Sequence, residues 1–177
     1  MPSSTPRVLI TPDDFDLSQQ VAALRAGDQR VGAVCTFVGT VRDRNDGQAV
    51  SSMELEHYPG MTEKAIDAMI TEALTRFDIF DARVVHRIGL LQPLDQVVLV
   101  AVTSAHRGDS FRACEFLMDY LKTQAPFWKK EATPQGARWV DARVSDDAAL
   151  ARWGITAGNA PMPDGLAPTV ALAGGRP

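Results

Sequence analysis

Three of the four lysines in this 177-residue chain stand within nine positions, in the segment KTQAPFWKKE. They are Lys122, Lys129 and Lys130, whereas nearly all the other cations are arginines. A lysine, unlike an arginine, can release its proton and act as an acid, a base or a nucleophile. Clustered cations also favour proton release and make an anion site. The segment is therefore a candidate for chemistry on an anion, although Lys122 also suits a helix C-terminus and Lys130 a solvated surface.

Further positive groups stand where secondary-structure elements are expected to end. Arg42 closes a β-branched run that leads into the turn signal Asn45-Asp46-Gly47. His106 and Arg107 fall between an apolar strand and the start of a helix. Unpaired N–H groups at a helix N-terminus bind phosphate, and an arginine there adds bidentate donors. The alternative for Arg107 is solvation or pairing with Asp109.

The sequence lacks the motifs of metal binding, nucleophilic catalysis and nucleotide binding. The three histidines, His57, His86 and His106, belong to no HxxxH, HExxH or Cys/His cluster, so we expect no metal site. There is no GxSxG, P-loop or GxGxxG motif, and hence no nucleotide site of those kinds is expected. Cys35 and Cys114 form no CxxC pair, which favours two buried thiols in a reduced, cytoplasmic protein.

The elements that position these groups follow from periodicity and turn residues. Runs rich in β-branched and aromatic residues predict strands at 8–10, 31–42, 51–58, 82–89, 96–105, 127–132 and 137–143. The strand at 96–105 is apolar throughout and is expected to be central in a sheet. Helices are predicted at 16–26, 61–77 and from Asp109 or Ser110, as the cap, to about Thr123.

In the third helix the spacing of Phe111, Cys114, Met118 and Leu121 predicts the inward face. Lys122 then lies at the edge of that face, in the last turn. Lys129 and Lys130 alternate on the following strand, so one of them can face the same cleft as Lys122. The fold class is α+β, a mostly antiparallel sheet with about three packed helices.

Composition bounds the kind of protein. The formal charge is −4 and the pI about 5.3, which argues against a general nucleic-acid binder. No apolar run approaches the length of a membrane span, and the N-terminus lacks a signal-peptide pattern.

Residues 154–177 hold five of the thirteen glycines and four of the eleven prolines. We therefore expect a folded domain over 1–153 and a flexible Gly/Pro/Ala-rich tail over 154–177.

A series of unusual short motifs then indicates a family. FVGTVRDRN, LEHYPGMTEKA, HRIG, VTSAHR, FLMDYLKT, APFWKKE and RWVDAR occur in this order. Together they resemble the large, catalytic subunit of molybdopterin synthase over roughly residues 7 to 153. The resemblance implies an α/β hammerhead fold and a homodimer. Each copy binds a small ubiquitin-like subunit, which makes a heterotetramer.

The resemblance also implies an activity. The small subunit ends in Gly-Gly, activated as a thiocarboxylate, and this tail enters a pocket of the large subunit. Two sulfurs pass to cyclic pyranopterin monophosphate and make the dithiolene of molybdopterin, with two tails consumed per product. The reaction requires no cofactor and no metal.

The resemblance in these motifs also implies which residues form the site. Lys122 is the leading catalytic residue, at the donor's terminal carbonyl, and Lys129 is the second. The residues expected to line the anion and pterin site are Arg42, His106, Arg107 and Arg143. Phe37 and Met118 are expected as apolar walls around the partner's tail, with a plain core position as the alternative for Met118.

Two other functions use the same residues. A non-catalytic module that only captures a ubiquitin-like tail would need the same sheet edges and cationic pocket. A small phosphate-ligand or RNA-binding domain would use Arg42, Arg107 and Lys129 with aromatic residues, and predicts salt-sensitive RNA binding.

Overall fold

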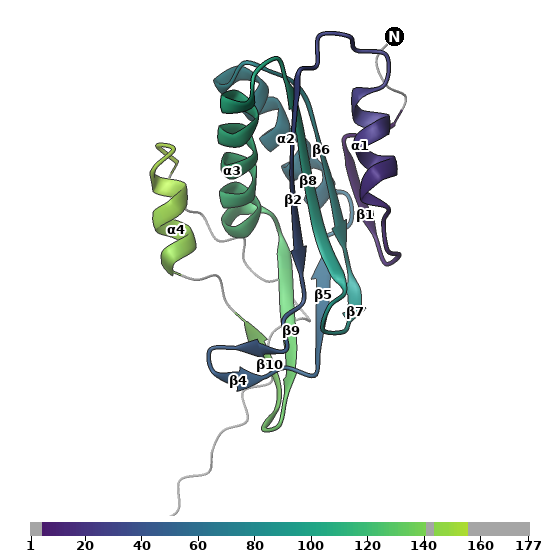
Figure 1. Cartoon of the computed structure of the whole chain (residues 1–177). Coiled ribbons are helices and arrows are strands. Elements are labelled where there is room, and N and C mark those ends of the chain that lie inside the picture. The colour runs from purple at the N-terminus through teal and green to yellow at the C-terminus, as the bar shows by residue number, and fades with distance from the viewer. Residues whose placement is uncertain (1–4, 141–143, 156–177) are drawn as a thin grey trace, which may run out of the picture.

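Two four-stranded sheets organise the described part of the chain, which comprises residues 5–140 and 144–155 of a computed structural model (Figure 1). The first sheet has the order β1-β6-β8-β2, and only its β1–β6 pair is parallel. Its strands are β1 (Val8–Thr11), β6 (Ile79–Arg87), β8 (Gln96–Ser104) and β2 (Ala33–Thr40).

The central position of β8 follows from its sequence. Val100 and Val102 face one side of the sheet, and Leu99 and Ala101 face the other. All four side chains are fully buried. A strand covered on both faces requires such a continuous apolar run, and the prediction that this strand is central is confirmed.

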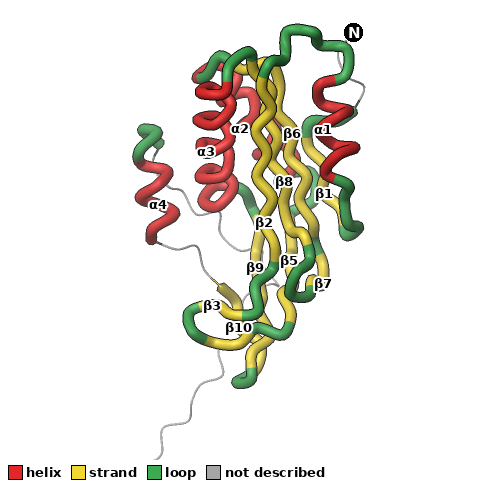
Figure 2. The backbone as a smooth tube through the Cα atoms, in the orientation of Figure 1, coloured by secondary structure: helices red, strands yellow, loops and turns green. Residues whose placement is uncertain are grey.

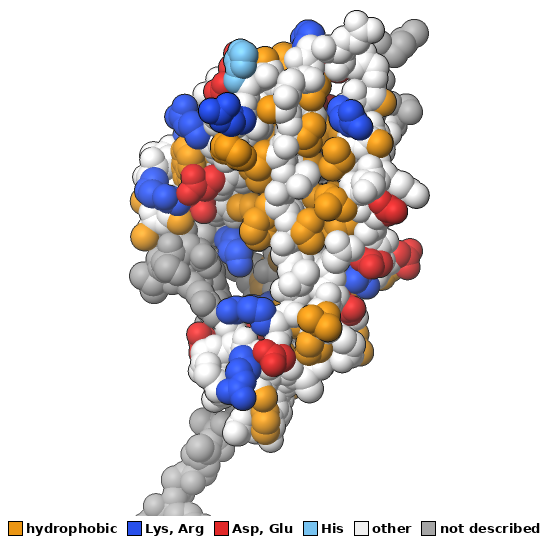
Figure 3. Space-filling view, in the orientation of Figure 1, with side chains coloured by type: hydrophobic (Ala, Val, Ile, Leu, Met, Phe, Trp, Pro, Cys, Tyr) orange, Lys and Arg blue, Asp and Glu red, His pale blue; other side chains and the backbone are white. Residues whose placement is uncertain are grey.

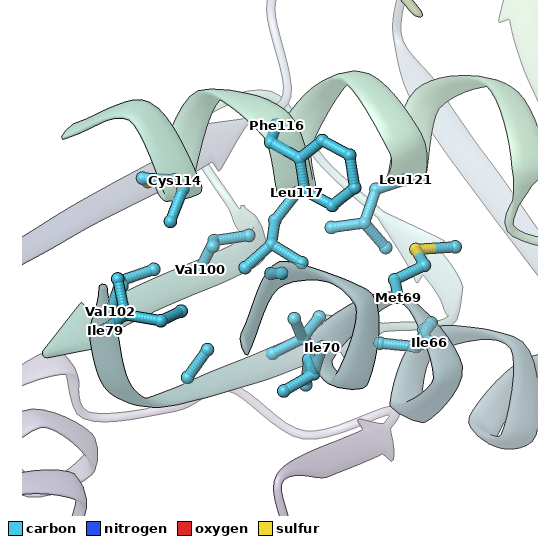
Figure 4. Close-up of a cluster of buried hydrophobic side chains, with 14 of the residues drawn as sticks. Ile66, Met69, Ile70, Ile79, Val100, Val102, Cys114, Phe116, Leu117 and Leu121 are labelled. Atoms are coloured by element: carbon cyan, nitrogen blue, oxygen red, sulfur yellow. The ribbon is translucent and has the colours of Figure 1, made fainter. Parts of the chain in front are cut away.

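Helices cover both faces of this sheet. On one face lie α2 (Met61–Arg76) and α3 (Arg107–Gln124), which interdigitate with β6 and β8 in the main core (Figure 4). On the opposite face lies α1 (Leu17–Arg25), capped by the Asp16 side chain, which accepts from the Gln19 backbone N–H (Figure 1). This sandwich fixes the position of every α3 side chain relative to the sheet.

The second sheet, β10-β9-β5-β7, is antiparallel and lies towards one end of the first (Figure 2). Its strands are β10 (Gly136–Val140), β9 (Phe127–Thr133), β5 (Ser52–His57) and β7 (Gly89–Leu91). A two-stranded hairpin, β3 (Arg44–Asn45) and β4 (Gln48–Ala49), turns at Asp46 and Gly47. Both residues have positive φ, as the predicted turn requires.

The α+β class is confirmed, with several differences in detail. The strands form two sheets rather than one, and the described residues include β7, the β3–β4 hairpin and a fourth helix, α4 (Val144–Ala151), none of which was predicted. Helix α3 begins at Arg107 with His106 as its N-cap, so the caps predicted at Asp109 and Ser110 were wrong. The predicted inward position of Phe111 was also wrong, since this side chain is 58% exposed.

No helix in the described ranges is long and apolar enough to cross a membrane. At the C-terminal end, Trp153 and Ile155 pack against the main core. The rest of the segment predicted to be a tail, residues 156–177, lies outside the described residues.

Candidate active site

A cavity of about 320 Å³ opens where the end of β2, the last turns of α3 and the second sheet meet. Figure 3 shows a hollow in this face of the molecule with basic side chains around it. Strands β5 and β9 supply one wall, and β2, β6 and α3 supply the others. The cavity therefore joins segments that are up to a hundred residues apart in sequence.

Five predicted site residues line this one cavity: Phe37, Arg42, Met118, Lys122 and Lys129. Phe37 is 41% exposed, which is unusual for a large apolar side chain on a strand, whereas Met118 also packs against the main core. The structure thus brings both predicted lysines and both predicted apolar walls together.

Two predicted residues lie elsewhere in the chain. His106 and Arg107 are exposed at the N-terminus of α3. Arg107 is fifteen residues before Lys122 on the same helix, which places their backbones about 22 Å apart. A single chain therefore does not bring this pair to the cavity. Arg143 lies outside the described residues.

The cavity is positively charged. Its charged lining, within the described part of the chain, consists of Arg42, Arg44, Lys122 and Lys129 against a single carboxylate, Glu131. Among the described residues, Arg42, Arg44 and Lys122 make no side-chain hydrogen bond or ion pair. Cations that have no partner in this part of the chain are suited to bind an anion that enters from solvent.

Glu131 organises the charged side of the cavity from a position that is only 3% exposed. One carboxylate oxygen accepts from Asn45 Nδ2 at 2.8 Å and lies 3.4 Å from Lys129 Nζ, and the other accepts from Arg138 at 3.3 Å. The buried carboxylate therefore ties β9 to β3 and β10, and it holds Lys129 at the cavity.

Lys130 has a different environment from its neighbour. Its ammonium lies over the Trp139 ring, 5.7 Å from the centroid, and the residue is not part of the cavity lining. The prediction that Lys129 and Lys130 point to opposite sides of the strand is confirmed, and Lys129 is the one that shares the cleft with Lys122.

His86 also lines the cavity and was not predicted as a site residue, although it stands in the motif HRIG. Its ring stacks on Phe127 with centroids 3.8 Å apart, and its Nδ1 lies 2.8 Å from the Arg87 carbonyl oxygen. Burial above all, with smaller contributions from the nearby charges of Lys122 and His57, lowers the pKa of His86 to about 4. The imidazole is therefore neutral at pH 7.

Arg44, Phe127 and Glu131 were also missed as site residues. Arg44 and Phe127 lie within motifs that did signal a site, the RDRN loop and the FWKKE segment. His86 and Glu131 also stand in quoted motifs, HRIG and APFWKKE, but nothing in these motifs indicates their roles, because those roles depend on long-range pairing.

The Cys114 thiol is not equipped as a nucleophile. Burial raises the pKa of the Cys114 thiol far above its ordinary value, and the neighbouring Cys35 adds to this effect. Both cysteines are free and Cys114 is buried, as predicted, but Cys35 is only half-buried, so the prediction of two buried thiols was wrong for Cys35. No cluster of three or more potential metal ligands occurs within residues 5–140 and 144–155.

Comparison with known proteins gives consistent matches. The family model described as MoaE protein matches residues 10–124. The molybdopterin synthase catalytic subunit of Ralstonia nicotianae is 63% identical over 155 residues, which is 88% of each chain. The subunit of the same name from Escherichia coli K12 is 50% identical over 147 residues, covering 83% of this chain and 97% of the relative.

Solved structures agree in fold. The molybdopterin biosynthesis MoaE protein of Burkholderia ambifaria superimposes with a TM-score of 0.74 at 60% identity, covering 85% of this chain and 99% of that one. Molybdopterin synthase from Staphylococcus aureus gives a TM-score of 0.71 at 32% identity, with 77% and 98% covered.

Proposed function

The chain belongs to the MoaE family of molybdopterin synthase catalytic subunits, an enzyme of molybdenum cofactor biosynthesis, and from this we propose a specific sulfur-transfer reaction for its cavity. The substrate is cyclic pyranopterin monophosphate. The donor is the C-terminal Gly-Gly thiocarboxylate of a small ubiquitin-like subunit, and two transfers build the dithiolene of molybdopterin.

The observation that carries this proposal is the meeting of Lys122, Lys129 and Arg42 around one cavity of about 320 Å³. Both reactants are anions, one a cyclic phosphate and the other a thiocarboxylate. Positive groups already fixed around a partly enclosed site stabilise such charges without reorganising during the reaction. The cavity volume also lies in the range of small-molecule sites.

The two lysines take different roles in this proposal. Lys122 has no ion-pair partner among the described residues, so its ammonium is available to polarise the donor's terminal carbonyl and to transfer a proton. Lys129 is held by the buried Glu131 and presents a fixed positive charge to the substrate. Phe37 and Met118 provide apolar walls against which the Gly-Gly tail of the partner can lie.

His106 and Arg107 join the site in this proposal through a second copy of the chain. Strand β2 has only one neighbour in its sheet, so its other edge is open within the described structure, and it carries the exposed side chains of Val34 and Phe37. The strand spans about 23 Å, which matches the length of helix between Arg107 and Lys122.

A second copy that packs along this edge in the reverse direction carries its α3 N-terminus to the cavity end of β2. This arrangement completes the anion site with His106 and Arg107 of the partner copy. With one small subunit bound to each copy, the assembly is a heterotetramer. Arg143 is the remaining proposed substrate-binding residue.

A reconstituted reaction tests the function. The chain is mixed with cyclic pyranopterin monophosphate and a cognate small subunit, which ends in either a thiocarboxylate or an ordinary carboxylate, and dithiolene product is measured. Product is expected only with the thiocarboxylate. Tight binding of the small subunit with no product from either form would instead favour the module that only captures a ubiquitin-like tail.

A further inference from the structure

His86 has one side of its ring committed to the protein and the other side open to the cavity. A carbonyl oxygen accepts hydrogen bonds and does not donate them, so the contact of Nδ1 with the Arg87 carbonyl places the ring hydrogen on Nδ1. The lone pair of the neutral ring is then on Nε2. Among the described residues Nε2 has no hydrogen-bond partner.

The ring is also fixed in orientation. Phe127 stacks on it at an interplanar angle of 18°, and Phe127 follows directly after the connection that ends α3. The same connection sets the position of Lys122, three residues before the Ala125 cap. The end of α3 therefore determines where Lys122 and His86 lie relative to each other.

Lys122 and His86 complement each other chemically. Both line the cavity, and the Lys122 ammonium is close enough to act electrostatically on the His86 ring. Lys122 has three N–H donors and no acceptor among the described residues. The other titratable group that acts on the ring, His57, lies on β5 and is 3.6 Å from Glu63.

We propose that His86 is a positioning residue for Lys122: its Nε2 accepts a hydrogen bond from the Lys122 ammonium once the donor tail enters the cavity, and so directs the remaining N–H groups at the terminal carbonyl of the tail. The inference rests on the proposed function and deepens it. A neutral acceptor suits this task because it orients the lysine without cancelling the positive charge that the anionic donor requires.

Two substitutions separate this role from a packing role. His86→Gln retains an acceptor near the position of Nε2 but loses the aromatic ring. His86→Phe retains a ring for stacking on Phe127 but loses the acceptor. The positioning role predicts that His86→Gln keeps most of kcat, whereas His86→Phe loses about tenfold to hundredfold, the effect of one hydrogen bond to a charged group.

The small subunit's Kd is expected to stay unchanged in both variants, and His57→Phe serves as the matched histidine control with a normal kcat. A packing role predicts the opposite order, with His86→Phe active and His86→Gln impaired. Any result in which His86→Phe matches or exceeds His86→Gln overturns the proposal.

A second readout does not depend on turnover, so it remains informative if the proposed sulfur transfer itself fails. In the complex with a small subunit that ends in an ordinary carboxylate, the ¹⁵N signal of Lys122 Nζ is expected to show slowed proton exchange in the wild type and in His86→Gln. Slowed exchange that persists in His86→Phe would contradict the hydrogen bond to His86. Absence of product from the wild type would count against the proposed function alone.

Discussion

At the scale of single residues, two adjacent lysines in one strand have different environments. Lys129 faces the cavity and Glu131, and Lys130 lies over Trp139. Strand alternation made this separation predictable from the sequence. The local pattern does not show which lysine faces the cavity, because that depends on the pairing of β9 with β5 and β10, which are distant in sequence; only the family resemblance named Lys129.

His86 gives the chain a specific sensitivity to acid. The folded chain binds a proton at His86 only near pH 4, whereas the unfolded chain binds it near the ordinary pKa of 6.5. Between these values the unfolded state holds more protons, so this contribution to stability is complete above about pH 6.5 and is lost as the pH falls towards 4. From pH 7 to pH 5 we expect a loss of roughly 1–2 kcal/mol from this residue.

Urea unfolding of the wild type and of His86→Phe at the two pH values measures this contribution. The variant is expected to lose less stability than the wild type, because it has no imidazole to protonate. Equal losses in the two proteins would mean that His86 is not kept neutral by the fold.

The roles of His86 and Glu131 could not be predicted from the sequence. Both residues act through atoms that other strands bring to them: the stacked Phe127 in one case, and Asn45 and Arg138 in the other. A local pattern carries no information about such partners. The lysine cluster, in contrast, was visible because its members are close in sequence.

At the scale of elements, the predicted strands and helices with strong periodicity were found. The amphipathic stripe of α2 and the apolar run of β8 are clear because each is long and buries a continuous face. The short β7 and the β3–β4 hairpin have two or three residues per strand, too few to show a period. Their existence depends on pairing with neighbours rather than on local sequence.

The error at α3 has a physical explanation. The N-cap, His106, is three residues before Asp109 and four before Ser110, and the buried face of the helix runs through Ser110, Cys114, Leu117 and Leu121. Phe111 lies one position away from that face and is turned to solvent. The large aromatic Phe111 was predicted to pack in the core, whereas the small Ser110 occupies the buried position.

Asp119 of α3 binds the two residues that directly follow helix α4, Arg152 and Trp153. Its carboxylate accepts from Trp153 Nε1 at 2.7 Å and from Arg152 at 3.1 Å. Asp119→Ala removes both bonds and leaves a half-buried indole N–H without a partner, so we expect a loss of about 1–3 kcal/mol in the free energy of unfolding. Amide exchange within α4 should accelerate more than exchange within β8.

Glu115→Ala is the matched control, because Glu115 also pairs with Arg152 but both side chains are more than half exposed. We expect this variant to lose about 0–1 kcal/mol. If Asp119→Ala were as stable as Glu115→Ala, the attachment of α4 would have to come from the apolar contacts of Trp153 instead.

At the scale of the whole molecule, predicted site residues occupy opposite ends of one helix. The sequence motifs predicted that Lys122 and Arg107 belong to one site, but the helix between them separates the two residues by about 22 Å. Their order in the sequence carried no information on this separation. The proposal of a second copy across β2 resolves it, since one copy then supplies the lysines and the other supplies His106 and Arg107.

Mixing two inactive variants tests this shared site. Lys122→Ala and Arg107→Ala are each expected to be inactive as homodimers. After subunit exchange, a mixed dimer contains one site with both defects and one intact site, so activity should return. A mixture that stays inactive although mixed dimers are present would place Arg107 and Lys122 in the same copy's site or outside the site.

The central claim is that the cavity lysine takes part in sulfur transfer, and the most direct test compares Lys122→Ala with Lys130→Ala. Both variants remove one positive charge from the same segment, but only Lys122 lines the cavity. In a single-turnover reaction with the thiocarboxylated small subunit and cyclic pyranopterin monophosphate, we expect Lys122→Ala to form dithiolene about a hundredfold or more slowly, with partner binding unchanged. Lys130→Ala should react at the wild-type rate. Equal rates for Lys122→Ala and the wild type would contradict the account.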